Sequence, residues 1–171
     1  MKKYLLVAVA ALVLVPAALA ADPGDSSAAA ACRTLQKTAP AMFGSGKTYK
    51  NLGACVSVKS QQADQNAANA AKTCQAERAD ANFAGSHDGK SFNDFYGSSS
   101  NEKGKGNALG KCVSSKAKAK SAEQNSAELN AAKQCKKERT ADPAAFKTKY
   151  GTNRTKSNAF GKCVAQKTQQ P

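Results

Sequence analysis

The chain has 171 residues and a formal net charge of +14. Beyond residue 20, leucine, isoleucine, valine and phenylalanine make up roughly 9% of the sequence, whereas disorder is expected when they fall below about 20% in a highly charged chain. These values exclude a single large globular core and a membrane protein with several spans.

The first 20 residues have the organisation of a secretory signal peptide. Two lysines follow Met1, an apolar run covers residues 5–15, and Ala18-Leu19-Ala20 supplies the small residues of a cleavage site. The apolar run is shorter than the roughly 20 residues that span a bilayer. We therefore predict cleavage near Ala20, a secreted protein located outside the cell or in the periplasm, and no transmembrane segment in the mature chain.

The mature chain is predicted to contain three tandem repeats, each bounded by two cysteines. The second cysteine of each repeat has the same neighbours. A glycine lies two residues before this cysteine, a valine directly follows it, and a lysine lies four residues after it. Glu77-Arg78 and Glu138-Arg139 follow the first cysteine of the second and third repeats, whereas Leu35-Gln36 occupies this place in the first repeat, which is therefore degenerate.

These patterns set the predicted boundaries. We expect a disordered segment over residues 21–31 and a short tail over residues 164–171. The repeats cover residues 32–55, 74–112 and 135–163, which we call the first, second and third brackets. The segments 56–73 and 113–134 connect them.

The connecting segments are predicted to be helical. They contain neither proline nor glycine and are rich in alanine, the best helix former. Asn51, Asn107 and Asn158 are candidate N-caps, since an asparagine side chain can accept a backbone N–H of the first turn. We expect one helix from Asn51 to about Arg78 and another from Asn107 through Arg139. The fold class is all-α, either a helical hairpin or separate modules on helical rods.

Helix geometry selects the disulfides. All six cysteines lie in the mature chain, and six cysteines in an exported chain with few core residues indicate a disulfide framework. Cys55 and Cys74 would be about 28 Å apart along one helix, and Cys112 and Cys135 about 35 Å apart along the other, whereas bonded cysteines have Cα atoms within about 7 Å. The repeat pattern then predicts the pairs Cys32–Cys55, Cys74–Cys112 and Cys135–Cys163.

The aromatic residues of the mature chain all lie inside the brackets. This distribution predicts three very small cores, each beside one disulfide. The nine residues are Phe43, Tyr49, Phe83, Phe92, Phe95, Tyr96, Phe146, Tyr150 and Phe160.

Positive charge is concentrated in the last part of the chain. Residues 135–171 carry a net charge of +7, against +3 for residues 21–73 and +2 for residues 74–134. Basic side chains interleaved with aromatic rings can hold a polyanion by counterion release and stacking; the alternative is a solvated basic face. The candidate polyanion-binding residues are Lys136, Lys137, Arg139, Lys147, Lys149, Arg154, Lys156, Lys162 and Lys167.

No catalytic, nucleotide or metal site is predicted. The segment Gly44–Thr48 resembles the end of a phosphate-binding loop, but Ala41 stands where that motif requires glycine. His87 is the only histidine, and we expect it to be solvated in a loop. The cysteines lack the close pairs typical of zinc sites. We therefore expect neither an enzyme nor a cofactor.

The pattern C-x-x-E-R … F … Y-G … N-A-F-G-K-C-V-x-x-K over residues 70–171 resembles small secreted bacterial proteins of unknown function that carry this unit in one or more copies. The resemblance implies secretion and repetition, and it implies no activity or substrate. We expect a secreted, non-enzymatic repeat protein with a structural or interaction role at or outside the cell envelope. The alternative is a polyanion-binding protein whose third repeat holds a wall polymer, anionic lipid or extracellular DNA.

Overall fold

The computed structural model describes residues 23–97 and 107–169. The predicted signal peptide lies outside the described residues. Within them the chain is helical and forms no β-strand, with only an isolated bridge between Phe43 and Tyr49. The elements are α1 (Pro23–Thr38), η1 (Pro40–Met42), α2 (Leu52–Ala79), η2 (Phe83–Ser86), α3 (Phe92–Tyr96), α4 (Ala108–Ala141), α5 (Pro143–Tyr150) and α6 (Ala159–Thr168).

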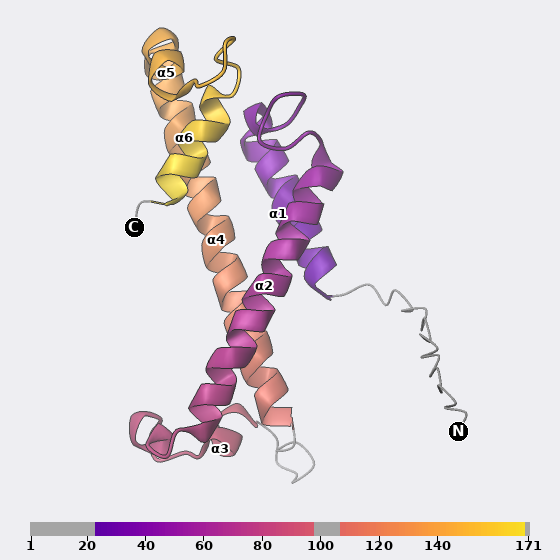
Figure 1. Ribbon diagram of the computed structural model, residues 1–171, viewed down its shortest axis with the longest axis vertical. Helices are drawn as coiled ribbons and strands as arrows, with labels where there is room; N and C mark the ends of the chain where they lie inside the picture. Colours follow the sequence, from indigo (N-terminus) through magenta and orange to yellow (C-terminus); the bar gives the residue numbers. More distant parts are fainter. Residues whose placement is uncertain (1–22, 98–106, 170–171) are drawn as a thin grey trace, which may run out of the picture.

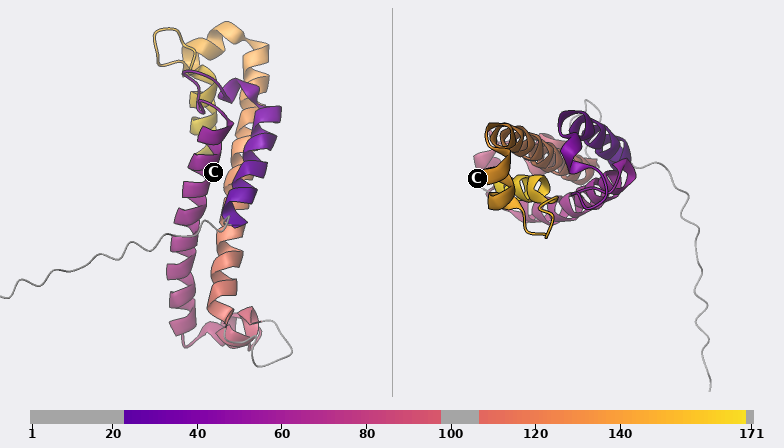
Figure 2. Two further views of the ribbon diagram at one scale, coloured as in Figure 1. Left: turned by 90° about the vertical axis from the view of Figure 1, so that its right-hand side faces the viewer. Right: turned by 90° about the horizontal axis from the view of Figure 1, so that it is seen from above.

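The two long helices form an antiparallel hairpin. Figures 1 and 2 show α2 and α4 running beside each other in opposite directions, with α3 at the connected end. Short α1 packs on α2, and α5 and α6 fold back along α4 at the opposite end. The predicted all-α fold with disulfide-stapled turns is confirmed, and of the two arrangements the chain adopts the hairpin.

Helix boundaries follow the prediction closely, but the caps do so only in part. The Asn51 side chain accepts a hydrogen bond from the Ala54 backbone N–H at 2.9 Å, and α2 begins at the next residue. Asn107 and Asn158 precede α4 and α6 without capping them through their side chains. The Asn158 amide instead bonds Thr152, so it organises the loop before α6.

Of the segment 21–31 that was predicted to be disordered, residues 23–31 are helical and belong to α1. This helix has a narrow buried face formed by Ala28, Cys32 and Leu35, and Ala39 directly after the helix extends it. Their spacing of four, three and four residues places them on one side of a helix. Packing of that face against the hairpin stabilises a segment whose composition alone indicated disorder.

Three disulfides close the brackets. They join Cys32 to Cys55, Cys74 to Cys112 and Cys135 to Cys163, with Cα–Cα distances of 5.9, 6.0 and 6.0 Å. All six cysteines are fully buried. These are the pairs that helix geometry selected, and each bridge ties one helix to the next across a turn.

The buried residues form two clusters instead of the three predicted. The lower cluster, beside α3, consists of Cys74, Phe83, Phe92, Ala108 and Cys112. The first and third brackets share a larger upper cluster at the opposite end, because α1, α4 and α6 meet there. Its larger members are Cys32, Leu35, Met42, Tyr49, Cys55, Cys135, Phe146, Tyr150, Phe160, Cys163 and Val164.

Between the clusters, the hairpin is held by small and polar side chains. The Asn66 amide of α2 is buried and donates to Ser121 Oγ at 3.0 Å and to Gln124 Oε1 at 2.8 Å on α4. Over residues 23–97 and 107–169, no helix combines the length and hydropathy needed to cross a bilayer.

Candidate functional site

Glu77 of the second bracket joins a tyrosine of the same bracket to a lysine of the following connecting segment. The Tyr96 hydroxyl donates to Glu77 Oε2 at 3.0 Å, and the Lys116 ammonium lies 2.9 Å from Glu77 Oε1. The hydrogen bond to Glu77 raises the pKa of Lys116, so the ammonium form is favoured. The contact connects α2, α3 and α4 beside the Cys74–Cys112 disulfide.

Glu138 of the third bracket forms the corresponding group with a tyrosine of that bracket and a lysine of α6. Glu138 accepts a hydrogen bond from the Tyr150 hydroxyl at 2.8 Å and contacts the Lys167 ammonium at 2.7 Å. Lys149 lies 3.8 Å from the same carboxylate. Hydrogen bonds from Lys167 and then Tyr150 are the main causes that lower the pKa of Glu138. The charged carboxylate is therefore the stable form.

The first bracket obtains its glutamate from another part of the chain. Leu35 occupies the position of Glu77 and Glu138 and is buried in the upper cluster. Glu128 of α4 replaces the missing carboxylate: it accepts from the Tyr49 hydroxyl at 2.8 Å and lies 2.5 Å from the Lys59 ammonium. Burial, followed by the charge of Glu128, raises the pKa of Tyr49.

These three groups have the chemistry of structural staples. In each, a tyrosine hydroxyl and a lysine ammonium both contact one carboxylate, whose negative charge is balanced by the lysine. The groups lie beside the disulfides and connect separate helices. Hydrogen bonds from the tyrosine and the lysine hold each carboxylate in one position and favour its charged form. This arrangement suits a structural contact better than proton transfer.

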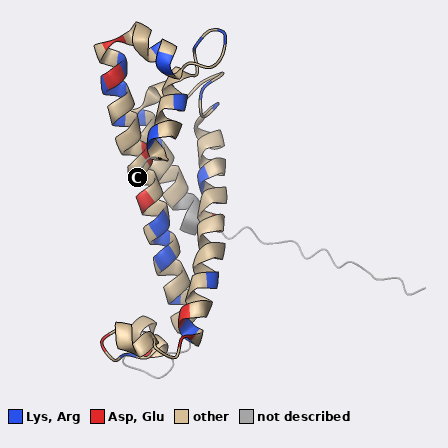
Figure 3. Cartoon of the chain, turned by 60° about the vertical axis from the view of Figure 1, so that its left-hand side comes forward, with Lys and Arg blue, Asp and Glu red and all other residues tan. Residues whose placement is uncertain are grey.

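The nine candidate basic residues occupy different environments. Lys149 and Lys167 contact Glu138, and the Arg139 guanidinium packs over the Phe160 ring at 4.9 Å. Among the described residues, the other six have no carboxylate partner. These are Lys136, Lys137, Lys147, Arg154, Lys156 and Lys162, all on α4, α5, α6 or the loop between α5 and α6. Figure 3 shows several basic positions gathered at this end of the hairpin.

The loop after η1 contacts the third bracket directly. Lys47 donates from Nζ to the Ser157 carbonyl oxygen at 2.7 Å. Gly161 lies so close to Thr48 that an added Cβ would clash with the Thr48 hydroxyl. The segment that resembled a phosphate-binding loop therefore brings a basic side chain of the first bracket to the basic end of the third.

A small basic pocket lies at this junction. Its volume is about 110 Å³, and basic side chains from four segments line it: Lys47, Arg139, Lys147 and Lys156. Phe146 and Phe160 contribute apolar wall, and no carboxylate is among its lining residues. Lys47 and Lys147 are exposed, whereas Arg139 and Lys156 are half-buried.

His87 lies at the other end of the molecule and is partly packed, unlike the solvated side chain we expected. Its ring stacks on Phe83 with centroids 3.7 Å apart and meets Phe95 edge-on at 4.6 Å. Nδ1 lies 2.8 Å from the Phe83 carbonyl oxygen. These contacts give the histidine a packing role in the turn of the second bracket.

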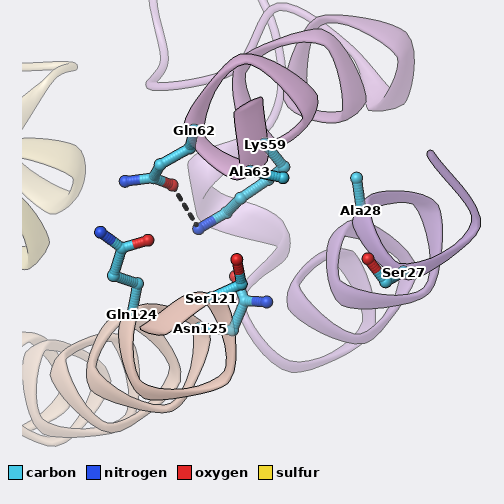
Figure 4. Close-up of a pocket in the computed structure, with 8 residues that line it drawn as sticks. All are labelled: Ser27, Ala28, Lys59, Gln62, Ala63, Ser121, Gln124 and Asn125. Atoms are coloured by element: carbon cyan, nitrogen blue, oxygen red, sulfur yellow. Dashed lines mark hydrogen bonds between the residues drawn. The ribbon is translucent and has the colours of Figure 1, made fainter. Parts of the chain in front are cut away.

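The other cavities bring together few charged side chains. A space of about 10 Å³ between α1, α2 and α4 is lined by polar side chains, and Lys59 contacts Gln62 there (Figure 4). It has room for about one water molecule. Two grooves of about 680 and 670 Å³ along α2 each have one acidic and one basic side chain among their lining residues. In the described part of the chain, no group of three or more histidine, cysteine or acidic side chains could hold a metal ion.

No protein-family model, curated protein or solved structure matches this chain. Two residues that the sequence did not single out have a role in the structure: Glu128 binds Tyr49 and Lys59, and Lys47 lines the basic pocket. A signal for Lys47 was present, since it lies in the segment Gly44–Thr48, which resembles the end of a phosphate-binding loop. No local signal marked Glu128, because its partners lie on α2 and in the preceding loop.

Proposed function

We propose that this chain is a secreted, non-enzymatic interaction protein that acts at or outside the cell envelope and binds an anionic polymer through the basic end of its hairpin. The observation that carries the proposal is the set of six basic residues in the third bracket that lack a carboxylate partner among the described residues. Such a surface attracts polyanions by releasing their condensed counterions.

Two features support a binding role over a catalytic one. The glutamates beside the disulfides are each engaged by a tyrosine and a lysine. The disulfides hold the helix ends in place, so the basic side chains are presented on a pre-organised surface, which reduces the entropy lost on binding. Three disulfides are also compatible with an oxidising compartment.

The test measures salt-dependent retention on immobilised heparin and DNA. Deleting the third bracket is unsuitable, because the first bracket shares the upper cluster with it. Charge-neutralised full-length chains avoid this problem. One variant replaces Lys136, Lys137, Lys147 and Lys162 by glutamine. The matched control replaces Lys37, Lys72, Lys90 and Lys118, which are exposed and lie outside the third bracket.

Both variants lose the same formal charge. We expect the third-bracket variant to elute at clearly lower salt than the control variant, because only it removes cations from the proposed surface. Equal elution of the two variants would contradict a localised site, and the absence of retention by the unmodified protein would overturn the proposed function.

A further inference from the structure

We propose that the pocket formed by Lys47, Arg139, Lys147 and Lys156 is a specific site for one phosphate group. The inference deepens the proposed function and rests on it for the source of the ligand, since the phosphate would be carried by a phosphodiester polymer. Binding of a phosphate group in the pocket depends only on the lining side chains, so free inorganic phosphate can test the pocket separately from the polymer.

The size of the pocket favours a small group. Its volume of about 110 Å³ is well below the roughly 300–1,000 Å³ of pockets that enclose drug-sized ligands. The four lining cations belong to four separate segments: the loop after η1, α4, α5 and the loop before α6. Cations from four segments suit a tetrahedral oxyanion, because its several oxygens can accept hydrogen bonds from different directions.

The cations retain donors for such a ligand. Lys47 uses one N–H on the Ser157 carbonyl, and a lysine ammonium has three. Arg139 stacks on Phe160, and a guanidinium packed by its face still offers its N–H groups at its edge. Lys147 and Lys156 have no acidic partner among the described residues. The Phe146 and Phe160 walls lower the local dielectric constant, which strengthens attraction for an anion.

The backbone holds Lys156 in an unusual position. Its φ angle is +54°, in the left-handed region that non-glycine residues seldom adopt. The side chain lies against Gly151, where an added Cβ would come within 2.7 Å of Lys156 Cβ and 2.8 Å of Lys156 Cδ. Such conformations persist when the surroundings fix them, and they are enriched at ligand sites. The glycine therefore provides the space in which Lys156 reaches the pocket.

The pocket also depends on both outer brackets. Lys47 comes from the first bracket and the other three cations from the third. A site made only of bulk positive charge would gain nothing special from Lys47. A site with defined phosphate contacts would instead lose affinity for phosphate when Lys47 is neutralised, although Lys47 lies outside residues 135–171, where positive charge is highest.

The experiment uses the full chain and two probes, a single-stranded thymidine oligonucleotide and inorganic phosphate at constant ionic strength. The pocket variant is Lys147→Gln with Lys156→Gln. The matched control, Lys136→Gln with Lys137→Gln, removes the same charge from a neighbouring surface. A second pair compares Lys47→Gln with Lys50→Gln, both in the same exposed loop.

We expect the pocket variant to lose about tenfold or more in oligonucleotide affinity, and the control about threefold or less. Lys47→Gln should weaken binding more than Lys50→Gln. Inorganic phosphate should cause saturable NMR shifts of the backbone amides of Lys47, Lys156 and Ser157 in the unmodified protein, and not in the pocket variant. Circular dichroism of each variant checks that the fold is retained.

The possible failures are distinct. Equal losses in the pocket and control variants would overturn the phosphate site and leave polymer binding by diffuse charge. Saturable phosphate shifts without oligonucleotide binding would support the pocket and overturn the phosphodiester polymer as its source. If neither probe binds, the phosphate site is wrong, and the proposed function is wrong as well if the unmodified protein is also not retained on heparin.

Discussion

The Tyr49 hydroxyl donates a 2.8 Å hydrogen bond to the Glu128 carboxylate, although 79 residues separate them in the sequence. The same carboxylate lies 2.5 Å from the Lys59 ammonium, and both charged side chains are buried. This contact joins the first bracket to the middle of α4. It supplies the carboxylate that the first bracket lacks, so α4 completes a group for which the other two brackets provide their own glutamate and tyrosine.

Glu128→Ala should destabilise the protein strongly. It would leave the buried Lys59 ammonium without its counter-charge, and breaking one side of a buried ion pair costs about 3–5 kcal/mol. Glu123→Ala is the control, because Glu123 forms an exposed pair with Lys120 on one helix and such pairs contribute about 0.5 kcal/mol. Urea unfolding with the disulfides intact measures both. Similar free energies of unfolding for the two variants would contradict the role of Glu128.

The contribution of Glu138 should depend on pH. Its pKa is lowered in the folded protein, so its stabilising effect is present above the ordinary carboxyl pKa of about 4.3 and is lost as the pH falls through the lower folded-state value. The difference in unfolding free energy between the unmodified protein and Glu138→Gln should therefore be larger at about pH 7 than at about pH 3. A difference that stays constant between these two pH values would rule out this linkage.

Loss of the Cys74–Cys112 disulfide should loosen one end of the molecule. This bridge closes 38 residues, for which loop-closure entropy gives about 4 kcal/mol, and it lies in the smaller cluster. In the variant Cys74→Ser with Cys112→Ser, we expect amide hydrogen exchange to accelerate in α3 and the adjoining ends of α2 and α4. The amides of α1 and α6 should remain the better protected; uniform loss would show that the two ends unfold together.

Gly161 and Gly53 should respond in opposite directions to alanine, although each lies two residues before a cysteine. At Gly53 the new Cβ would lie 3.4 Å from Asn51 Oδ1, an ordinary contact, and alanine favours a helix by about 1 kcal/mol. At Gly161 the Cβ would clash with Thr48, and such overpacking costs about 1–3 kcal/mol.

Thermal unfolding should therefore place Gly161→Ala below the unmodified protein and Gly53→Ala at or above it. Adding Thr48→Ala to Gly161→Ala removes the clashing hydroxyl and should restore part of the lost stability. If the double variant is no more stable than Gly161→Ala alone, the clash with Thr48 is not the cause.

Local patterns predicted the helices and the cysteine pairs, because alanine-rich composition and residue spacing along a helix act over short distances. They did not decide between a hairpin and separate modules. The reason lies in contacts such as that of Asn66 with Ser121 and Gln124: polar pairs and alanine faces leave no strong apolar stripe along α2 or α4.

The errors have a related cause. The buried face of α1 is formed by Ala28, Cys32 and Leu35, and Ala39 directly after the helix extends it. These residues have a helical spacing but include only one large apolar side chain. The prediction of three cores failed because packing between the first and third brackets depends on close approaches such as that of Thr48 to Gly161. The basic residues could be recognised in the sequence from their charge. Which of them pair with Glu138, stack on Phe160 or line the pocket depends on the tertiary structure.

The shared upper cluster also affects the order in which the parts of the chain can fold. Leu35 packs in the same cluster as Val164, which lies far from it in the sequence, and contacts between such distant residues slow folding. Residues 74–112 contain both cysteines of their own disulfide and all the buried residues of the lower cluster, so they can form both without the other brackets. The first bracket needs α4 and α6, so it is among the last parts of the chain to reach its final packing.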